Sequence, residues 1–105
     1  MDGQLTRGAK RRLLCVENKD GTIDGADARI GWVTFSKTGQ SVYYRDKVLK
    51  KTSRGIRGNF YEETTGEEYW VSGVKKRGSN GHWAEAPAIV VDEDAREEYE
   101  RIRSQ

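Results

Sequence analysis

The fold is decided by two stretches of the sequence: residues 32–45, WVTFSKTGQSVYYR, and residues 58–73, GNFYEETTGEEYWVSG. Each stretch joins two short runs of aromatic and β-branched residues through a turn, and such runs are typical of β-strands. Gly39 in the first turn and Gly66 in the second suit the left-handed position of a short hairpin loop. Both stretches therefore predict β-hairpins.

Further strands are predicted on both sides of these hairpins. Within residues 12–17, alternation places Leu13 and Cys15 on one face and Leu14 and Val16 on the other. The same kinds of runs, bounded by turn residues, recur along the chain. We expect strands at residues 12–17, 30–36, 41–45, 48–50, 58–63, 67–72 and 89–91.

Residues 92–103 predict a helix after the last of these strands. Asp92 can cap its first turn, because a carboxylate accepts hydrogen bonds from the exposed N–H groups there. Ala95, Tyr99 and Ile102 fall on one stripe of the helix. We expect this stripe to pack on an edge or an open end of the sheet.

Length and element order indicate the fold class. A chain of 105 residues is one domain in size. Residues 1–10 are polar and show no hydrophobic period, so we expect a flexible arm there and a single β-rich domain over residues 11–105. The strand spacing indicates a mainly β fold. We expect a small antiparallel barrel or a strongly curved sheet, of SH3-like or OB-like size, with one C-terminal α-helix.

The two hairpin stretches also carry a resemblance. Residues 33–44 fit the pattern V-x-F-S-K-x-G-x-S-[VI]-Y-Y, and residues 59–76 contain T-G-E-E-Y-W-[VI]-S-G-x-K-K. In this pattern the chain resembles a group of small uncharacterised bacterial proteins, over about residues 31–83. Some members of the group carry the label deoxyxylulose-phosphate synthase. That class of enzyme is several times longer and holds thiamine diphosphate between domains, so we expect the label not to apply. The resemblance implies kinship without a function.

Composition argues against several classes of protein. Cys15 and His82 are each the only residue of their type, so neither a zinc-ligand spacing nor an internal disulfide is present. Asp20 and Asp24 begin a pattern like a calcium loop, but its twelfth position is Gly31, where a bidentate Glu is needed. No apolar run approaches the about 20 residues that span a bilayer, and no secretory segment is visible. We expect a cytoplasmic protein without membrane association, metal or cofactor.

The candidates for catalysis are weak. No glycine loop of phosphate-binding type occurs. Cys15 lies in an apolar run, which favours a buried thiol over a nucleophile paired with His82. Glu62 and Glu67 flank the turn of the second hairpin, and such carboxylates usually mark a solvated tip. We expect the chain not to be an enzyme; a small hydrolase that uses these hairpin carboxylates is the weaker alternative.

Charge is distributed unevenly along the chain, although its net value is only +2. Residues 1–57 carry thirteen Lys and Arg against six Asp and Glu, whereas residues 84–105 carry three against seven. A basic first half and an acidic end favour either a surface that faces a polyanion or charge pairing between the two halves.

Aromatic residues are concentrated in the middle of the chain, where nine of the ten lie between Trp32 and Trp83. A closed interior of this size cannot hold so many rings, so some are expected on the outside beside cations. Tyr43 or Tyr44, together with Tyr61 and Tyr69, is positioned to project from a sheet face. In the competing interpretation all the rings form the core.

These observations favour a binding role over a catalytic one. We expect a non-enzymatic small interaction module that binds a protein partner through an aromatic and basic sheet face. RNA or single-stranded DNA is the alternative ligand of the same face, because stacking rings flanked by cations suit it. The candidate binding residues are Tyr44, Arg45, Lys50, Lys51, Tyr69, Lys75, Lys76 and Arg77.

Overall fold

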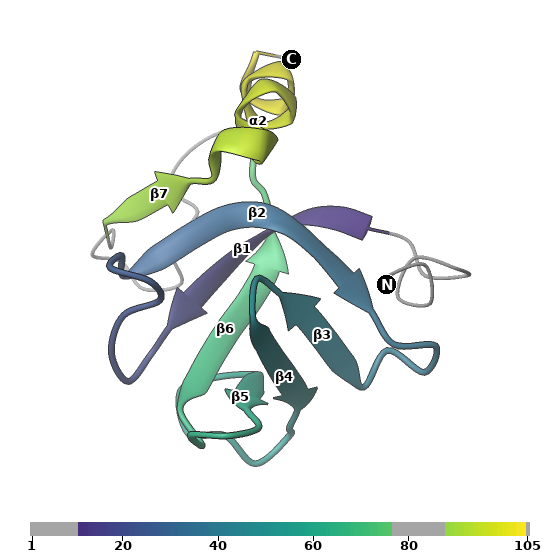
Figure 1. Ribbon diagram of the computed structural model, residues 1–105, viewed down its shortest axis with the longest axis vertical. Coiled ribbons are helices and arrows are strands. Elements are labelled where there is room, and N and C mark those ends of the chain that lie inside the picture. The colour runs from purple at the N-terminus through teal and green to yellow at the C-terminus, as the bar shows by residue number, and fades with distance from the viewer. Residues whose placement is uncertain (1–10, 77–87, 105) are drawn as a thin grey trace.

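The chain forms a closed antiparallel barrel of six strands, with a seventh strand and a C-terminal helix at one end (Figure 1). The computed structural model describes residues 11–76 and 88–104. The predicted fold class is therefore confirmed. The elements are β1 (Arg11–Asn18), β2 (Ala28–Phe35), β3 (Ser41–Tyr44), β4 (Lys47–Lys51), β5 (Phe60–Glu62), β6 (Glu68–Gly73), β7 (Ile89–Val91), the 3₁₀ helix η1 (Glu93–Ala95) and α2 (Arg96–Arg103).

The barrel closes because β1 pairs with both β2 and β6, while the strands between them pair in chain order. The edge of β2 that does not face β1 pairs with two different strands. Thr34 and Phe35 pair with β3, whereas Ala28–Ile30 pair in parallel with β7. Gly31 and the residues next to it therefore lie where β3 and β7 diverge.

Alternating side chains build two apolar clusters on the two sides of the barrel wall. Leu14 and Val16 belong to the interior cluster, and Cys15 and Leu13 belong to the outer one, as the alternation predicts. The outer cluster lies beneath β7 and α2 and includes Tyr99. The buried residues of the interior are Leu14, Val16, Ile23, Val33, Val42, Tyr44, Leu49, Phe60, Tyr69 and Val71.

Hairpin turns fix which side chains reach the interior. Gly39 and Gly66 have φ of 76° and 78°, the left-handed conformation that the sequence predicts for them. The turn between β3 and β4 lacks glycine, and Arg45 itself takes φ of 56° there. With this turn, β3 and β4 pair in the register that places Tyr43 opposite Val48.

The C-terminal helical segment covers residues 93–103, but its start differs from the expectation. Asp92 makes no capping hydrogen bond through its side chain. Its carboxylate is instead buried and accepts a hydrogen bond from the hydroxyl of Tyr44. The predicted capping role of Asp92 is therefore wrong, because its carboxylate accepts hydrogen bonds from a buried phenol and from Arg29 instead.

Two expectations fall outside the described residues: the flexible arm at 1–10 and the side chain of Arg77. Within residues 11–76 and 88–104, no helix has the length and apolar character that crossing a bilayer requires.

The buried thiol of Cys15 predicts a loss of stability in alkali. Burial raises the pKa of this thiol to about 11 from its ordinary value of 9.0. The folded protein thus retains a proton that the unfolded chain releases above pH 9, so stability falls as pH rises. We expect Cys15 to contribute about 1 kcal/mol to the fall in unfolding free energy between pH 8 and pH 10.

Urea unfolding of the wild type and of Cys15→Ala at both pH values measures this contribution. The variant should lose less stability than the wild type over the interval. An identical loss in both proteins would show that the thiol titrates equally in the folded and unfolded states.

Candidate functional site

Two of the predicted binding residues, Tyr44 and Tyr69, lie inside the barrel and cannot form an exposed face. Their exposed fractions are 2% and 0%. Burial raises the pKa of both phenols, and each hydroxyl has a partner in the structure. Tyr44 donates to Asp92, whereas Tyr69 accepts a hydrogen bond from the Asn18 amide at 3.2 Å. The prediction that these two rings bind a ligand is therefore wrong.

Arg45 lies at the rim of the barrel and is held by carboxylates of this chain. Its Nε donates to Asp24 at 2.6 Å, and its Nη1 lies 3.4 Å from Asp92. The hydrogen bond to Arg45 lowers the pKa of Asp24, and the same bond raises the pKa of Arg45. Lys47 lies 3.6 Å from Asp24 as well. Arg45 is consequently a structural cation.

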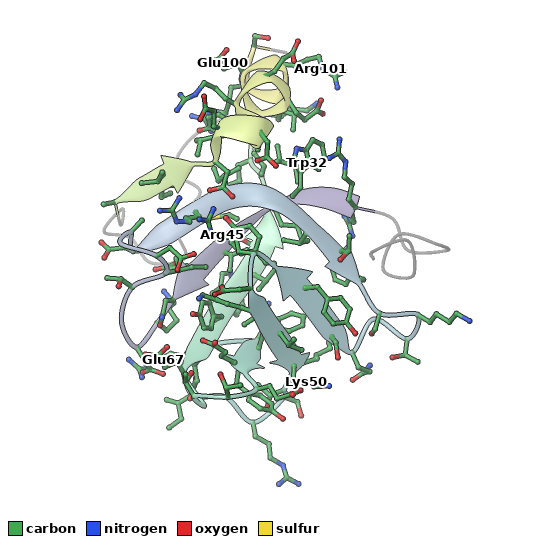
Figure 2. The ribbon with its side chains drawn as sticks, viewed as in Figure 1. Trp32, Arg45, Lys50, Glu67, Glu100 and Arg101 are labelled. Atoms are coloured by element: carbon green, nitrogen blue, oxygen red, sulfur yellow. The ribbon has the colours of Figure 1, made fainter. Side chains whose placement is uncertain are left out.

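The predicted lysines divide into two groups at opposite ends of the barrel. Lys51 pairs across strands with Phe60, level with the start of β6, and Figure 2 places Lys50 at the end away from the helix. Lys75 and Lys76 follow the end of β6 and lie beside the helix, where Arg103 donates to the Lys75 carbonyl at 3.0 Å. The structure therefore does not unite them in one basic patch.

An aromatic and basic surface does exist, on the outer side of β3, β4 and β5. Tyr43 lies opposite Val48, and Lys50 lies opposite Tyr61. Their strand neighbours point into the interior, so these four side chains share the outer side of the wall. We call these four residues the tyrosine face.

Exposure separates the tyrosine face from the core beneath it. Tyr61 is 38% exposed, although its neighbour Phe60 is buried. Tyr43 and Val48 are half-buried. Lys50 is 39% exposed on its side chain and forms an ion pair with Glu63 at 3.3 Å. The tyrosine face is therefore a solvent-facing surface with an amphipathic lining.

The loop at residues 52–59, which joins β4 to β5, carries one exposed apolar side chain. Ile56 is 89% exposed. The loop around it is held by the carboxylate of Glu68, which accepts hydrogen bonds from the N–H groups of Arg57 at 2.7 Å and Gly58 at 2.9 Å. These backbone bonds lower the pKa of Glu68. Ile56 is thus presented to solvent from a fixed backbone.

Sequence reasoning selected Tyr44 and Tyr69, which are buried, and did not select Tyr43 and Tyr61. It also missed Ile56. Alternation already placed Tyr43 and Tyr44 on opposite faces, but it could not say which face is enclosed. Lys50 supplied an indirect signal, because a lysine disfavours the interior and so marks its neighbour Leu49 as the inward-facing residue of β4. The basic stretch at residues 51–57, with its serine and glycine, predicts an exposed loop, but a single isoleucine within it does not indicate a binding role.

The hairpin carboxylates have structural partners. Glu62 accepts hydrogen bonds at 3.3 Å from Tyr69 and from both hydroxyls of the turn, and Glu67 lies 3.4 Å from the Asn18 amide. Among the described residues, no three side chains of His, Cys, Asp or Glu gather into a group that could hold a metal ion.

Comparison of the chain with protein-family models, with curated proteins and with solved structures gives no match.

Proposed function

We propose that this chain is a non-enzymatic interaction module that binds a protein partner through the tyrosine face and the adjoining Ile56 loop. The observation that carries the proposal is the exposure of Tyr61, which follows the buried Phe60 on β5, and of Ile56, on a loop whose backbone is held by Glu68. Phe60, Tyr44 and Tyr69 are buried in the barrel interior, whereas Tyr61 is exposed and Tyr43 is half-buried on its outer side.

Such a surface matches the chemistry of protein interfaces. Tyrosine, with a large apolar body and a polar tip, is enriched among the residues that dominate binding energy. Tyr43 and Tyr61 are anchored on strands, so binding orders few side chains and loses little conformational entropy. Ile56 adds an apolar contact on a loop that Glu68 holds in place.

Charge pairing favours a protein partner over a nucleic acid. Most cations near the face are matched by carboxylates of the chain: Lys50 by Glu63, Arg57 by Asp20, and Arg45 by Asp24. Binding of a phosphate backbone relies on cations that can replace its counterions. A partner with apolar side chains and a few carboxylates would instead leave these pairs intact.

RNA or single-stranded DNA is the second candidate ligand, and one observation favours it. Lys51, at the end of β4, and Arg54, in the loop that follows, are exposed and have no ion pair within the described part of the chain. Cations beside stacking rings suit a single strand. Binding of that kind weakens steeply with salt, whereas an interface centred on tyrosine and isoleucine does not.

The double substitution Tyr43→Ala and Tyr61→Ala tests the proposal. We expect it to weaken capture of the partner about 30-fold or more, because interface tyrosines in this position often contribute about 2 kcal/mol. The thermal midpoint should change little, since both rings lie outside the core. The measurement is retention of proteins from nuclease-treated lysate on the immobilised chain, followed at two salt concentrations.

Lys75→Ala with Lys76→Ala serves as the control at the opposite end of the barrel and should retain the partner fully. Loss of the captured band after nuclease treatment, or equal capture by the tyrosine variant, would contradict a protein interface on this face.

A further inference from the structure

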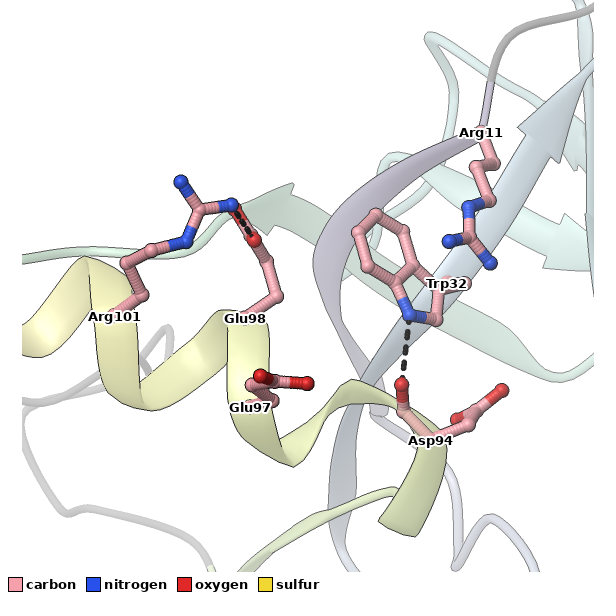
Figure 3. A pocket seen from close by; sticks show the side chains of 6 residues that line it. All are labelled: Arg11, Trp32, Asp94, Glu97, Glu98 and Arg101. Carbon is pink, nitrogen blue, oxygen red and sulfur yellow. Dashed lines mark hydrogen bonds and ion pairs between the residues drawn. The ribbon is translucent and has the colours of Figure 1, made fainter.

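A second surface lies at the helix end of the barrel, away from the tyrosine face. An open groove of about 490 Å³ lies between the helical segment of η1 and α2 and the two long strands β1 and β2. Figure 3 shows the side chains that line it. Trp32 is one of its lining residues, and Figure 2 places this residue next to the helix. The groove is lined by Arg11, Trp32, Asp94, Glu97, Glu98 and Arg101.

A cationic side chain already lies against the indole ring of Trp32. The guanidinium of Arg11 lies over its ring at 4.0 Å from the centroid. The indole N–H donates to the carbonyl oxygen of Asp94 at 3.0 Å, which fixes the ring relative to the helical segment. A fixed indole face that holds a guanidinium shows the chemistry of a cation-binding site.

Of the three carboxylates that line the groove, two have no cationic partner among the described residues. Glu98 pairs with Arg101 along the helix. Asp94 and Glu97 line the same groove, and neither carboxylate has an ion pair or side-chain hydrogen bond to another described residue. Arg11 also forms no ion pair among the described residues. Its guanidinium therefore stacks on the Trp32 ring without pairing with the carboxylates of Asp94 and Glu97.

We propose that this groove binds an arginine side chain of a protein partner. In the absence of the partner, Arg11 covers the face of the Trp32 ring on which the partner's arginine would stack. The incoming guanidinium would stack on Trp32 while its N–H groups reach Asp94 and Glu97. Arginine fits better than lysine, because its planar group can stack and donate bidentate hydrogen bonds at the same time. This site is separate from the tyrosine face, and the proposal for the groove does not depend on the function proposed for that face.

The position of Arg11 over the Trp32 ring predicts that its removal strengthens binding. In Arg11→Gln the ring is free, so an external guanidinium no longer competes with a tethered one. We expect the dissociation constant for capped arginine, N-acetyl-arginine amide, to fall about threefold or more, given the strength of exposed cation–π contacts. Replacement of both Asp94 and Glu97 by their amides should weaken binding by at least a similar factor.

The experiment is a titration of ¹⁵N-labelled protein, with the Trp32 indole N–H signal identified from the spectrum of Trp32→Phe. Capped arginine is compared with capped citrulline, its neutral isostere, and with capped lysine. Arg12→Gln is the matched control, because Arg12 lies 5.9 Å from the ring of Phe35 and away from the groove. It should bind like the wild type.

The expected result is a saturable shift of the Trp32 signal with capped arginine, tightened by Arg11→Gln, and little shift with citrulline or lysine. An equal response to citrulline or lysine would overturn the proposal. So would an absence of any shift in Arg11→Gln, or an equal gain from Arg12→Gln.

Discussion

Replacement of Asp92 by alanine is expected to lower the free energy of unfolding by about 3–5 kcal/mol, because it removes one partner of a buried ion pair. The Asp92 carboxylate accepts the hydroxyl of Tyr44 on one oxygen. Its other oxygen lies 3.1 Å from Nη1 of Arg29 and 3.4 Å from Nη1 of Arg45. Without Asp92, a buried phenol and a mostly buried guanidinium lose their shared acceptor. Urea unfolding monitored by tryptophan fluorescence measures the loss.

The position of Asp92 explains why this loss should be large. The residue follows β7 and fills the place where β3 and β7 diverge from β2, joining the end of the chain to the barrel. Asp46→Ala is the control, because its carboxylate is 83% exposed and its ion pair with Lys47 should contribute under about 1 kcal/mol. Equal effects of the two substitutions would contradict a structural role for the Asp92 site.

Replacement of Gly58 by alanine is expected to cost about 3 kcal/mol, for a different reason. A Cβ at this position would lie 2.8 Å from the backbone nitrogen of Tyr69, and still closer to the carbonyl oxygen of that residue. Both atoms belong to β6, so neither can move without disturbing the pairing of β5 with β6. The Ile56 loop and the strand that carries Tyr61 should therefore be displaced together.

Gly73→Ala provides the matched control for Gly58→Ala. Gly73 ends β6, has no positive φ, and nothing lies within 4 Å of the position of its Cβ. Its substitution should leave the urea midpoint unchanged or raise it slightly, since alanine restricts the unfolded chain. A similar loss in both variants would show that the close approach at Gly58 carries no particular penalty.

Much of the fold could be predicted from local patterns, because strand and turn signals act over a few residues. The hairpins around Gly39 and Gly66, the alternation in β1 and the terminal helix all follow from such signals. The role of Asp92 could not be predicted in this way. Its partners Arg29 and Tyr44 are distant in sequence, and only the closed barrel brings them together.

The candidate site was harder to predict for a similar reason. A period of two residues separates Tyr43 from Tyr44 but leaves open which of them faces the interior, until barrel closure selects Tyr44. The two lysine clusters look alike in sequence, yet the direction of β6 carries Lys75 and Lys76 to the helix end, away from Lys50 and Lys51. Composition indicates which kinds of residue form the surface, but it does not show which individual residues lie together on it.

The central claim is that the tyrosine face contacts a protein, and photo-crosslinking from that face tests it most directly. The photoreactive residue p-benzoylphenylalanine would replace Tyr61 in one variant and Lys76, at the helix end, in another. The account predicts a discrete protein adduct from position 61, formed equally after nuclease treatment and at high salt, and none from position 76. A nuclease-sensitive adduct, or the same adducts from both positions, would contradict it.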